Sequence, residues 1–232
     1  MFDLDGTLVD SRRDLAASVN AVRRELGLEP LPVERVVAFV GEGARKLVRR
    51  SLPETVDGAP FESAFERFLE CYYHRCLEET RTYSGIEGLL DALAGRYPLA
   101  VLTNKPERHT RKILAGLGLC RWLRFAVGGD SLAARKPDPV PLLETARRLG
   151  AEPSRVLLVG DSSTDAETAR NAGVPAVLVR WGFGRPEELD AFDAVLRPTH
   201  PREILSFLGA GGESPESGRD SPPGAGRRRQ RL

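Results

Sequence analysis

The sequence predicts an α/β protein in which a Rossmann-like parallel sheet core carries an inserted, all-helical cap domain. After Tyr83, short apolar runs that end in polar or glycine residues alternate with helical segments. This alternation is typical of a parallel sheet covered by helices on both faces. Between positions 11 and 82, apolar residues recur every three or four positions and no strand pattern appears. We therefore expect a core of residues 1–10 and 83–208 and a helical cap of residues 11–82.

The individual elements follow from the same periodicity. The first core strand is expected to end at Asp3 and Asp5, just before Gly6. In the cap, a first helix is expected to end at Gly27, followed by helices over 32–39, 44–52 and 61–77, the last with an apolar stripe that includes Tyr72. The later core strands are expected over 99–103, 125–128, 156–160 and 176–179, with helices over 86–93, 107–117, 139–149 and 165–172.

The composition is that of a soluble globular protein. The 232 residues are 41% apolar and 29% charged, and the net charge of +1 gives no bulk attraction to nucleic acid or membranes. We find no apolar run of about 18 residues that would span a membrane and no leader that would act as a signal peptide. Cys71, Cys76 and Cys120 are expected to be reduced thiols. These features predict a cytoplasmic protein, monomeric or homodimeric, without nucleic-acid or membrane partners.

The end of the chain differs from the rest in composition. From Gly209 onward it consists largely of Gly, Ser, Pro, Glu and Arg, with almost no apolar residue. Such a segment cannot bury enough apolar surface to fold. We therefore expect residues 209–232 to form a disordered tail.

Two aspartates separated by one residue stand at the start of the chain. Asp3 and Asp5 follow an apolar strand end and precede Gly6. Side chains alternate in direction along a strand, so the two carboxylates start on the same side. Like charges this close repel each other unless a cation or different roles separate them. We interpret the pair as machinery for phosphoryl transfer.

Polar side chains also follow the later strands. Thr103 and Asn104 follow the second strand, and Asp161 and Asp165 follow the fourth. Lys136 lies between the third strand and the next helix, where the proline after it favours an extended loop conformation. Ligands of open parallel sheets bind beyond the carboxyl ends of the strands. These side chains are therefore expected to meet the aspartate pair at one site.

The residue types match a mechanism that passes through an aspartyl-phosphate. Asp3 is the expected nucleophile. Asp5 is the expected acid that protonates the leaving oxygen and later deprotonates water. Lys136 and the Thr103 hydroxyl, with nearby backbone N–H groups, are expected to bind and neutralise the phosphoryl oxygens.

Mg²⁺ is the expected cofactor, because it prefers hard oxygen ligands. Its expected protein ligands are Asp3, the backbone carbonyl of Asp5, and Asp161, with Asp165 in the shell behind them. Asp161 and Asp165 could also favour the N-terminus of a helix, which is compatible with metal binding. Neighbouring serines lack the histidine and aspartate partners of a serine hydrolase.

Four segments in this order resemble the haloacid dehalogenase-like superfamily. They are DLDGTLVDS at 3–11, LTN at 102–104, Lys-Pro at 136–137 and GDSSTD at 160–165. The resemblance covers about residues 1–208 and implies the core-and-cap fold described above. The dehalogenases that name the superfamily have a different residue two positions after the nucleophile, so Asp5 favours phosphate chemistry.

Within that superfamily, the chain is most similar to phosphoglycolate phosphatases. The matching segments are FVGEGARKL at 39–47, TNKP at 103–106 and KPDPVPLL at 136–143. In that family the glycine loop of the cap closes over the core site. The resemblance implies that Gly41 and Gly43 let the backbone approach the substrate. It also implies that Arg45 or Lys46 pairs with the carboxylate of 2-phosphoglycolate, the first candidate substrate.

Some of these residues have a simpler alternative role. The basic residues of 45–50 could instead form a solvated helix face. Asn104 is expected to contact substrate, whereas Lys105 is either a surface charge or a contact to substrate or phosphate. His109, in the following helix, is expected on the surface.

The sequence thus predicts a Mg²⁺-dependent phosphomonoester hydrolase that acts on a small phosphorylated metabolite. Pyrophosphate, sugar phosphates and nucleotides stay open as substrates. A phosphosugar mutase, an isomerase of the same superfamily, is a second hypothesis that the TNKP segment at 103–106 disfavours. A third hypothesis is a binding or regulatory protein that has lost its catalytic strand, which the complete set of motif side chains argues against.

The start of the chain departs from the family pattern. Met1 directly precedes Phe2, where members have several apolar residues, and a strand usually needs about five residues. Either in-frame codons upstream encode an apolar run, which we favour, or the central strand is stunted. A short strand also places Asp3 close to a mobile terminus.

Overall fold

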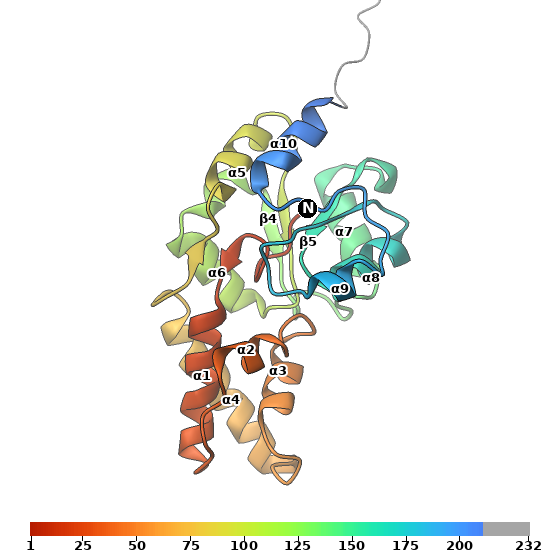
Figure 1. Ribbon diagram of the computed structural model, residues 1–232. Helices are drawn as coiled ribbons and strands as arrows, with labels where there is room; N and C mark the ends of the chain where they lie inside the picture. Colours follow the sequence, from red (N-terminus) through yellow and green to blue (C-terminus); the bar gives the residue numbers. More distant parts are fainter. Residues whose placement is uncertain (211–232) are drawn as a thin grey trace, which may run out of the picture.

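The computed structural model describes residues 1–210, and these confirm the expected α/β fold with a helical block at one end (Figure 1). The helical block contains α1 (Arg12–Glu25), α2 (Val33–Val37), α3 (Ala44–Ser51) and α4 (Gly58–Arg75). The sheet and its covering helices contain β1 (Val9–Asp10), β2 (Arg81–Thr82), α5 (Ile86–Ala94), β3 (Ala100–Leu102), α6 (Glu107–Gly116), η1 (Leu119–Trp122), β4 (Phe125–Val127), α7 (Val140–Leu149), η2 (Pro153–Arg155), β5 (Leu158–Gly160), α8 (Ser163–Ala172), β6 (Ala176–Leu178), α9 (Pro186–Leu189) and α10 (Pro201–Ala210).

The N-terminal segment lies at the centre of the parallel sheet. β3 pairs in parallel with β4, and β5 pairs in parallel with β6. Phe2 lies between the two pairs and bridges in parallel to Val101 of β3 and Val159 of β5. Its N–H donates to Ala100 O at 3.0 Å, and its carbonyl accepts from Leu102 N–H at 2.9 Å. The order across the sheet is therefore β4, β3, the segment around Phe2, β5 and β6.

This central segment forms two isolated bridges at Phe2, to Val101 and to Val159, rather than a regular strand. The terminal amino group of Met1 is buried and donates to Leu157 O at 2.9 Å. Burial lowers the pKa of this amine to about 5. The Asp3 N–H donates to Val159 O at 2.8 Å, so main-chain bonds on both sides of the segment set the position of Asp3.

Helices cover both faces of the sheet, and the first two residues reach one face each. Phe2 belongs to an apolar cluster with buried residues of α5, α6 and α10. Met1 belongs to a second cluster with buried residues of α7 and α8. Burying a side chain as large as Phe2 contributes about 1.5–3 kcal/mol. The two clusters together clamp the segment that carries Asp3.

A short ribbon joins the helical block to the core. Val9 pairs antiparallel with Thr82, and Asp10 with Arg81. The expectation of no strand between positions 11 and 82 is therefore wrong at its end, because a two-residue strand is too short to show a period. The ribbon binds together the two points where the chain passes between the sheet and the helical block.

A second junction packs α4 of the helical block against α6 of the core. His109 is buried there, contrary to its expected place on the surface. Its Nε2 lies 2.9 Å from Leu69 O, and its ring stacks on Tyr72 with centroids 5.4 Å apart. Burial lowers the pKa of His109, so the ring is neutral and Nε2–H donates to the carbonyl. The Lys112 ammonium also donates to the Tyr73 carbonyl.

Three further expectations concern the chain as a whole. α10 includes residues 209 and 210, and the rest of the expected tail, 211–232, lies outside the described residues. Cys71, Cys76 and Cys120 are free thiols, as expected. Within residues 1–210, no helix combines the length and apolar character needed to cross a membrane.

Candidate active site

The carboxyl ends of the central strands bring the expected side chains together. Asp3, Thr103, Lys136, Asp161 and Asp165 are all buried. The Lys136 ammonium lies 2.9 Å from Asp3 Oδ1 and 2.6 Å from Asp165 Oδ1. These three groups come from the central segment, the loop before α7 and the start of α8, so the register of the sheet brings them into contact.

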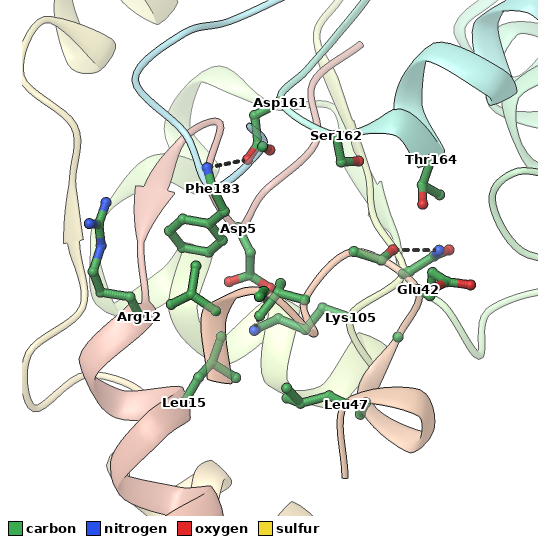
Figure 2. A pocket seen from close by; sticks show the side chains of 18 of the residues that line it. Asp5, Arg12, Leu15, Glu42, Leu47, Lys105, Asp161, Ser162, Thr164 and Phe183 are labelled. Atoms are coloured by element: carbon green, nitrogen blue, oxygen red, sulfur yellow. Dashed lines mark hydrogen bonds and ion pairs between the residues drawn. The ribbon is translucent and has the colours of Figure 1, made fainter. Parts of the chain in front are cut away.

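Three carboxylates form a compact cluster. Asp3, Asp161 and Asp165 each place an oxygen within 4.8 Å of the others. Asp161 accepts a hydrogen bond from the Thr7 hydroxyl at 2.9 Å and one from the Phe183 N–H at 2.7 Å, the latter drawn in Figure 2. Burial, together with the smaller effects of the nearby Asp3 and Asp165 charges, raises the pKa of Asp161 to about 8.

The charges of the cluster fit a divalent cation. Burial raises the pKa of Asp3 to about 6, because Lys136 offsets only part of that effect. Burial also lowers the pKa of Lys136, but Asp165 and Asp3 outweigh it and raise the pKa above its ordinary value. One lysine cannot neutralise three carboxylates, and hard oxygen atoms suit Mg²⁺. The donor set therefore fits the expected metal.

Asp165 contacts protein groups through both of its oxygens. Oδ1 accepts from Lys136, and Oδ2 accepts from the Ser162 N–H at 3.1 Å and the Ser162 hydroxyl at 2.6 Å. The Ser162 side chain also accepts from the Asp165 N–H, which completes a capping box at the start of α8. This geometry suits a residue that orients the lysine and the other carboxylates.

The turn after Asp5 requires a glycine. Gly6 has φ +81°, and a Cβ there would lie 2.0 Å from Asp161 Oδ2. The next residue, Thr7, donates its hydroxyl to the same carboxyl group. The Asp-Gly-Thr sequence therefore folds the first loop directly onto Asp161.

Asp5 is not a member of this cluster, and in Figure 2 its carboxyl group points away from Asp161 and toward the helical block. The Ser11 hydroxyl donates to Asp5 Oδ1 at 2.5 Å, and the Lys105 ammonium donates to Oδ2 at 2.6 Å. The Lys105 side chain is 3% exposed, which excludes the alternative that it is a surface charge. The backbone N–H of Lys105 donates to Thr103 Oγ1 at 3.3 Å.

The glycine loop of the helical block lies against Asn104. Asn104 Nδ2 donates to Gly41 O at 3.0 Å and to Lys136 O at 2.9 Å. Gly41 has φ +122° and Gly43 has φ +94°, and a Cβ on Gly43 would lie 3.3 Å from Asn104 O. The two glycines thus permit a close approach between the loop and the core.

Arg45 does not reach the site, contrary to expectation. Its guanidinium makes two hydrogen bonds to Glu62, at 2.8 and 2.7 Å, and lies 4.6 Å from the Phe65 ring centroid. These contacts with the aromatic and acidic face of α4 therefore hold the Arg45 guanidinium outside the site. Arg50 lines the cavity instead, and it bonds to Glu42.

A cavity of about 500 Å³ separates the strand ends from the helical block. Its core wall includes all of the expected polar residues except Lys136 and Asp165, namely Asp3, Asp5, Thr103, Asn104, Lys105 and Asp161. Its opposite wall is mostly apolar and includes Leu15, Val33, Val37, Leu47, Phe68 and Leu69. The cavity thus combines a charged end with an apolar end.

Two contributors to this cavity were not predicted from the sequence. The loop after β6 supplies Phe183, which bonds to Asp161 and lies under the Arg12 guanidinium at 5.4 Å. A Cβ on Gly184 would lie 1.9 Å from Asp161 O, and the Gly-Phe-Gly run could have signalled this close approach. Tyr72, placed only on an apolar stripe, also lines the cavity.

The sheet, the buried carboxylates and the helical block over them define a core-and-cap α/β hydrolase. The chain belongs to the haloacid dehalogenase-like hydrolases, whose family model matches residues 1–179. A phosphoglycolate phosphatase from Nitrosospira multiformis is 40% identical over 198 residues, 83% of this chain and 87% of that protein. An N-acetylmuramic acid 6-phosphate phosphatase from Pseudomonas aeruginosa is 38% identical over 90% of this chain and 93% of that protein.

Solved structures agree with this assignment. The crystal structure of a predicted phosphoglycolate phosphatase from Haemophilus somnus superposes with a TM-score of 0.83 at 30% identity. The superposition covers 89% of this chain and 96% of the Haemophilus somnus chain. The superfamily expected from the four sequence segments is therefore confirmed.

Proposed function

We propose that this chain is a Mg²⁺-dependent phosphomonoester hydrolase that works through an aspartyl-phosphate on Asp3. Residues 1–10 and 83–208 act as its core, and residues 11–82 act as the cap over the cavity. One observation carries the proposal: Asp3 lies in the cluster with Lys136 and Asp161, whereas Asp5 lies apart from that cluster in the same cavity. Paired carboxyl groups in different environments suit different roles.

In the first step, an oxygen of Asp3 attacks phosphorus while the ester P–O bond breaks. Asp5 gives a proton to the leaving oxygen, and the Lys136 ammonium and the Thr103 hydroxyl bind phosphoryl oxygens. Asp3, Asp161 and the Asp5 carbonyl would hold Mg²⁺, which when bound neutralises charge on the phosphoryl oxygens.

In the second step, a water molecule attacks the same phosphorus while Asp5 takes its proton. The P–O bond to Asp3 breaks, and phosphate leaves with the carboxylate restored. The cap limits water during the first step and reopens for product release.

The first candidate substrate is 2-phosphoglycolate. Its support is the set of phosphoglycolate phosphatases that are about 40% identical to this chain. The test is a phosphate-release screen that ranks 2-phosphoglycolate, pyrophosphate, sugar phosphates and nucleotides by kcat/KM, with and without Mg²⁺. A separate incubation with glucose 1-phosphate is analysed for glucose 6-phosphate, whose formation would support a mutase instead.

The cavity favours a larger sugar phosphate as a second candidate. About 500 Å³ lies in the size range that holds drug-sized ligands, well beyond a two-carbon acid. The cap wall is mostly apolar, and the cavity residue Arg50 is already paired with Glu42. A sugar phosphate with an apolar substituent, such as an N-acetylated sugar 6-phosphate, would fill this end. A higher kcat/KM for such an ester than for 2-phosphoglycolate would favour this candidate.

The role of Asp3 has a direct test. Asp3→Asn should abolish turnover while the far-ultraviolet circular dichroism spectrum and the melting transition stay those of a folded protein. Phosphate release by this variant in a single turnover, once deamidation has been excluded by mass spectrometry, would contradict the nucleophile assignment.

A further inference from the structure

Lys105 is a buried cation in the cavity to which the mechanism above gives no role. We propose that Lys105 is a positioning residue that holds the Asp5 carboxyl group in place for proton transfer, and that α4 supports it through Tyr72. This inference rests on the proposed function, because it assigns a task to Asp5 in that reaction.

The contacts of Asp5 show how it is held. Lys105 Nζ lies 2.6 Å from Asp5 Oδ2, and the Ser11 hydroxyl lies 2.5 Å from Oδ1. The Asp5 side chain is 10% exposed. A carboxyl group bound at both oxygens cannot rotate freely, yet each oxygen keeps a second lone pair for a proton or a substrate atom. Lys105 and Ser11 thus fix the orientation of the Asp5 carboxyl group and leave one lone pair free on each of its oxygens.

Lys105 is itself held at both ends. Its N–H donates to Thr103 Oγ1 at 3.3 Å, and its carbonyl accepts from the Gly129 N–H at 2.8 Å. Its ammonium lies 4.5 Å from the centroid of the Tyr72 ring. A cation over an aromatic face is attracted by the negative charge of that face, and more strongly where water is excluded. The orientation of the Asp5 carboxyl group therefore depends on how α4 packs against the core.

The same burial argues against substrate binding as the main task of Lys105. Its ammonium contacts both the Asp5 carboxylate and the Tyr72 ring, and 3% of the side chain is exposed. Little of it is left for an incoming anion. By contrast, a positioning role uses both of the contacts that the structure contains.

If Lys105 positions Asp5, its loss should impair the two proton transfers in which Asp5 takes part. Asp5 donates its proton when the ester P–O bond breaks and accepts a proton from water when the P–O bond to Asp3 breaks. An alkyl ester needs both transfers. p-Nitrophenyl phosphate has a good leaving group, so it needs only the second. A loosely held Asp5 should therefore slow both steps for an alkyl ester and mainly the second step for p-nitrophenyl phosphate.

The experiment compares Lys105→Met, Lys105→Arg and the unaltered chain in stopped flow with saturating Mg²⁺. Lys112→Met is the matched control, because Lys112 also lies over a tyrosine ring of α4, Tyr73, at 4.3 Å. For Lys105→Met we expect kcat on an alkyl phosphate to fall about 10²–10⁴-fold, the range for one acid–base group. With p-nitrophenyl phosphate we expect a burst of nitrophenolate followed by a slow steady rate. Lys105→Arg should recover part of kcat. Lys112→Met removes a contact of the same junction without touching Asp5, so it should lower kcat far less than Lys105→Met and give no burst.

Two results would overturn the proposal. One is a rise in KM for 2-phosphoglycolate with unchanged kcat and no burst, which would make Lys105 a substrate contact. The other is an equal loss for both ester types together with a lowered Tm, which would make its role structural. If the unaltered chain hydrolyses neither ester, the proposed function itself fails, and the inference fails with it.

Discussion

At the scale of single residues, the burial of the Asp161 carboxylate beside two other carboxylates has an electrostatic cost for folding. Its carboxyl group is buried beside Asp3 and Asp165, and two hydrogen bonds from Thr7 and Phe183 offset only part of that cost. An asparagine can keep both partners, since its oxygen can accept from the Phe183 N–H and its amide can donate to the rotatable Thr7 hydroxyl. Asp161→Asn is therefore a conservative change in shape that removes one negative charge.

The first prediction concerns the stability of this variant without metal. The pKa of Asp161 is raised from 3.8 to about 8, so the folded protein binds more protons than the unfolded chain between these values. The contribution of Asp161 to stability therefore falls as pH rises through this window. With a chelator present, the free energy of unfolding of Asp161→Asn should increase relative to that of the unaltered chain as pH rises from about 4 to about 8. A constant difference in urea titrations across this range would contradict the prediction.

The second prediction concerns the metal. Mg²⁺ should raise the Tm of the unaltered chain at about pH 8, because binding to the folded state alone stabilises it. Asp161→Asn should require at least about 10–100-fold more Mg²⁺ for half of that shift, since even groups behind the ligands change affinity by this much. Equal Mg²⁺ titration curves for the two proteins, followed by scanning calorimetry, would argue against Asp161 as a ligand.

At the scale of elements, Asn104 connects the loop before α3 to the loop before α7. Its amide donates to the carbonyls of Gly41 and Lys136. Asn20 provides a matched comparison within the helical block, because it donates to Leu31 O at 2.9 Å and accepts from Leu31 N–H at 2.8 Å. The two residues hold different loops by the same kind of contact.

The third prediction is that Asn104→Ala loosens the glycine loop. Amide hydrogen exchange over residues 39–46 should become faster, because the Gly41 carbonyl loses its donor. Asn20→Ala should instead speed exchange around Leu31 and leave residues 39–46 unchanged. Mass spectrometry of peptic peptides measures both. Unchanged exchange at 39–46 in Asn104→Ala would show that other contacts hold the loop.

Elements and strand ends were predictable wherever the pattern was local. The helices and the core strands follow from periodicity, and the strand ends placed Asp3, Thr103, Lys136 and Asp161 in one site. The β1–β2 ribbon was not predictable, because two residues show no alternation. The burial of Lys105 depends on α4, a partner far away along the chain.

Distant contacts also explain why the sequence could not show which basic residue of α3, Arg45 or Arg50, lines the cavity. Arg45 and Arg50 look equivalent in the sequence, and both lie on an exposed, charged helix. Glu62 and Phe65 of α4 hold Arg45 outside the cavity, whereas Glu42 holds Arg50 at its edge. The choice between them is made by tertiary contacts that no local pattern encodes.

At the scale of the whole molecule, the junction of α4 with α6 fixes the helical block on the core. His109 donates to Leu69 O and stacks on Tyr72, which in turn lies over Lys105. The junction is therefore continuous with the site. Its stability should affect how well the helical block is docked over the cavity.

The fourth prediction is that His109→Phe weakens this junction. The ring stack survives, but the buried Leu69 carbonyl loses its donor, at a cost of about 1–3 kcal/mol at neutral pH. Burial lowers the pKa of His109, so the unfolded chain protonates first below about pH 6.5 and the native contribution of His109 is lost as pH falls. The difference in free energy of unfolding should therefore shrink toward about pH 5. The exposed His74→Phe is the control, and a difference independent of pH would contradict the account.

The proposed mechanism requires that Asp3 becomes phosphorylated during turnover. Borohydride reduces an aspartyl-phosphate to homoserine, which peptide mass spectrometry can locate in the chain. The measurement uses Asp5→Asn with p-nitrophenyl phosphate and Mg²⁺, quenched during the burst, because loss of the base should let the intermediate accumulate. We expect homoserine at position 3 in an amount that matches the burst. A nitrophenolate burst with no homoserine at position 3, or with homoserine at another aspartate, would contradict it.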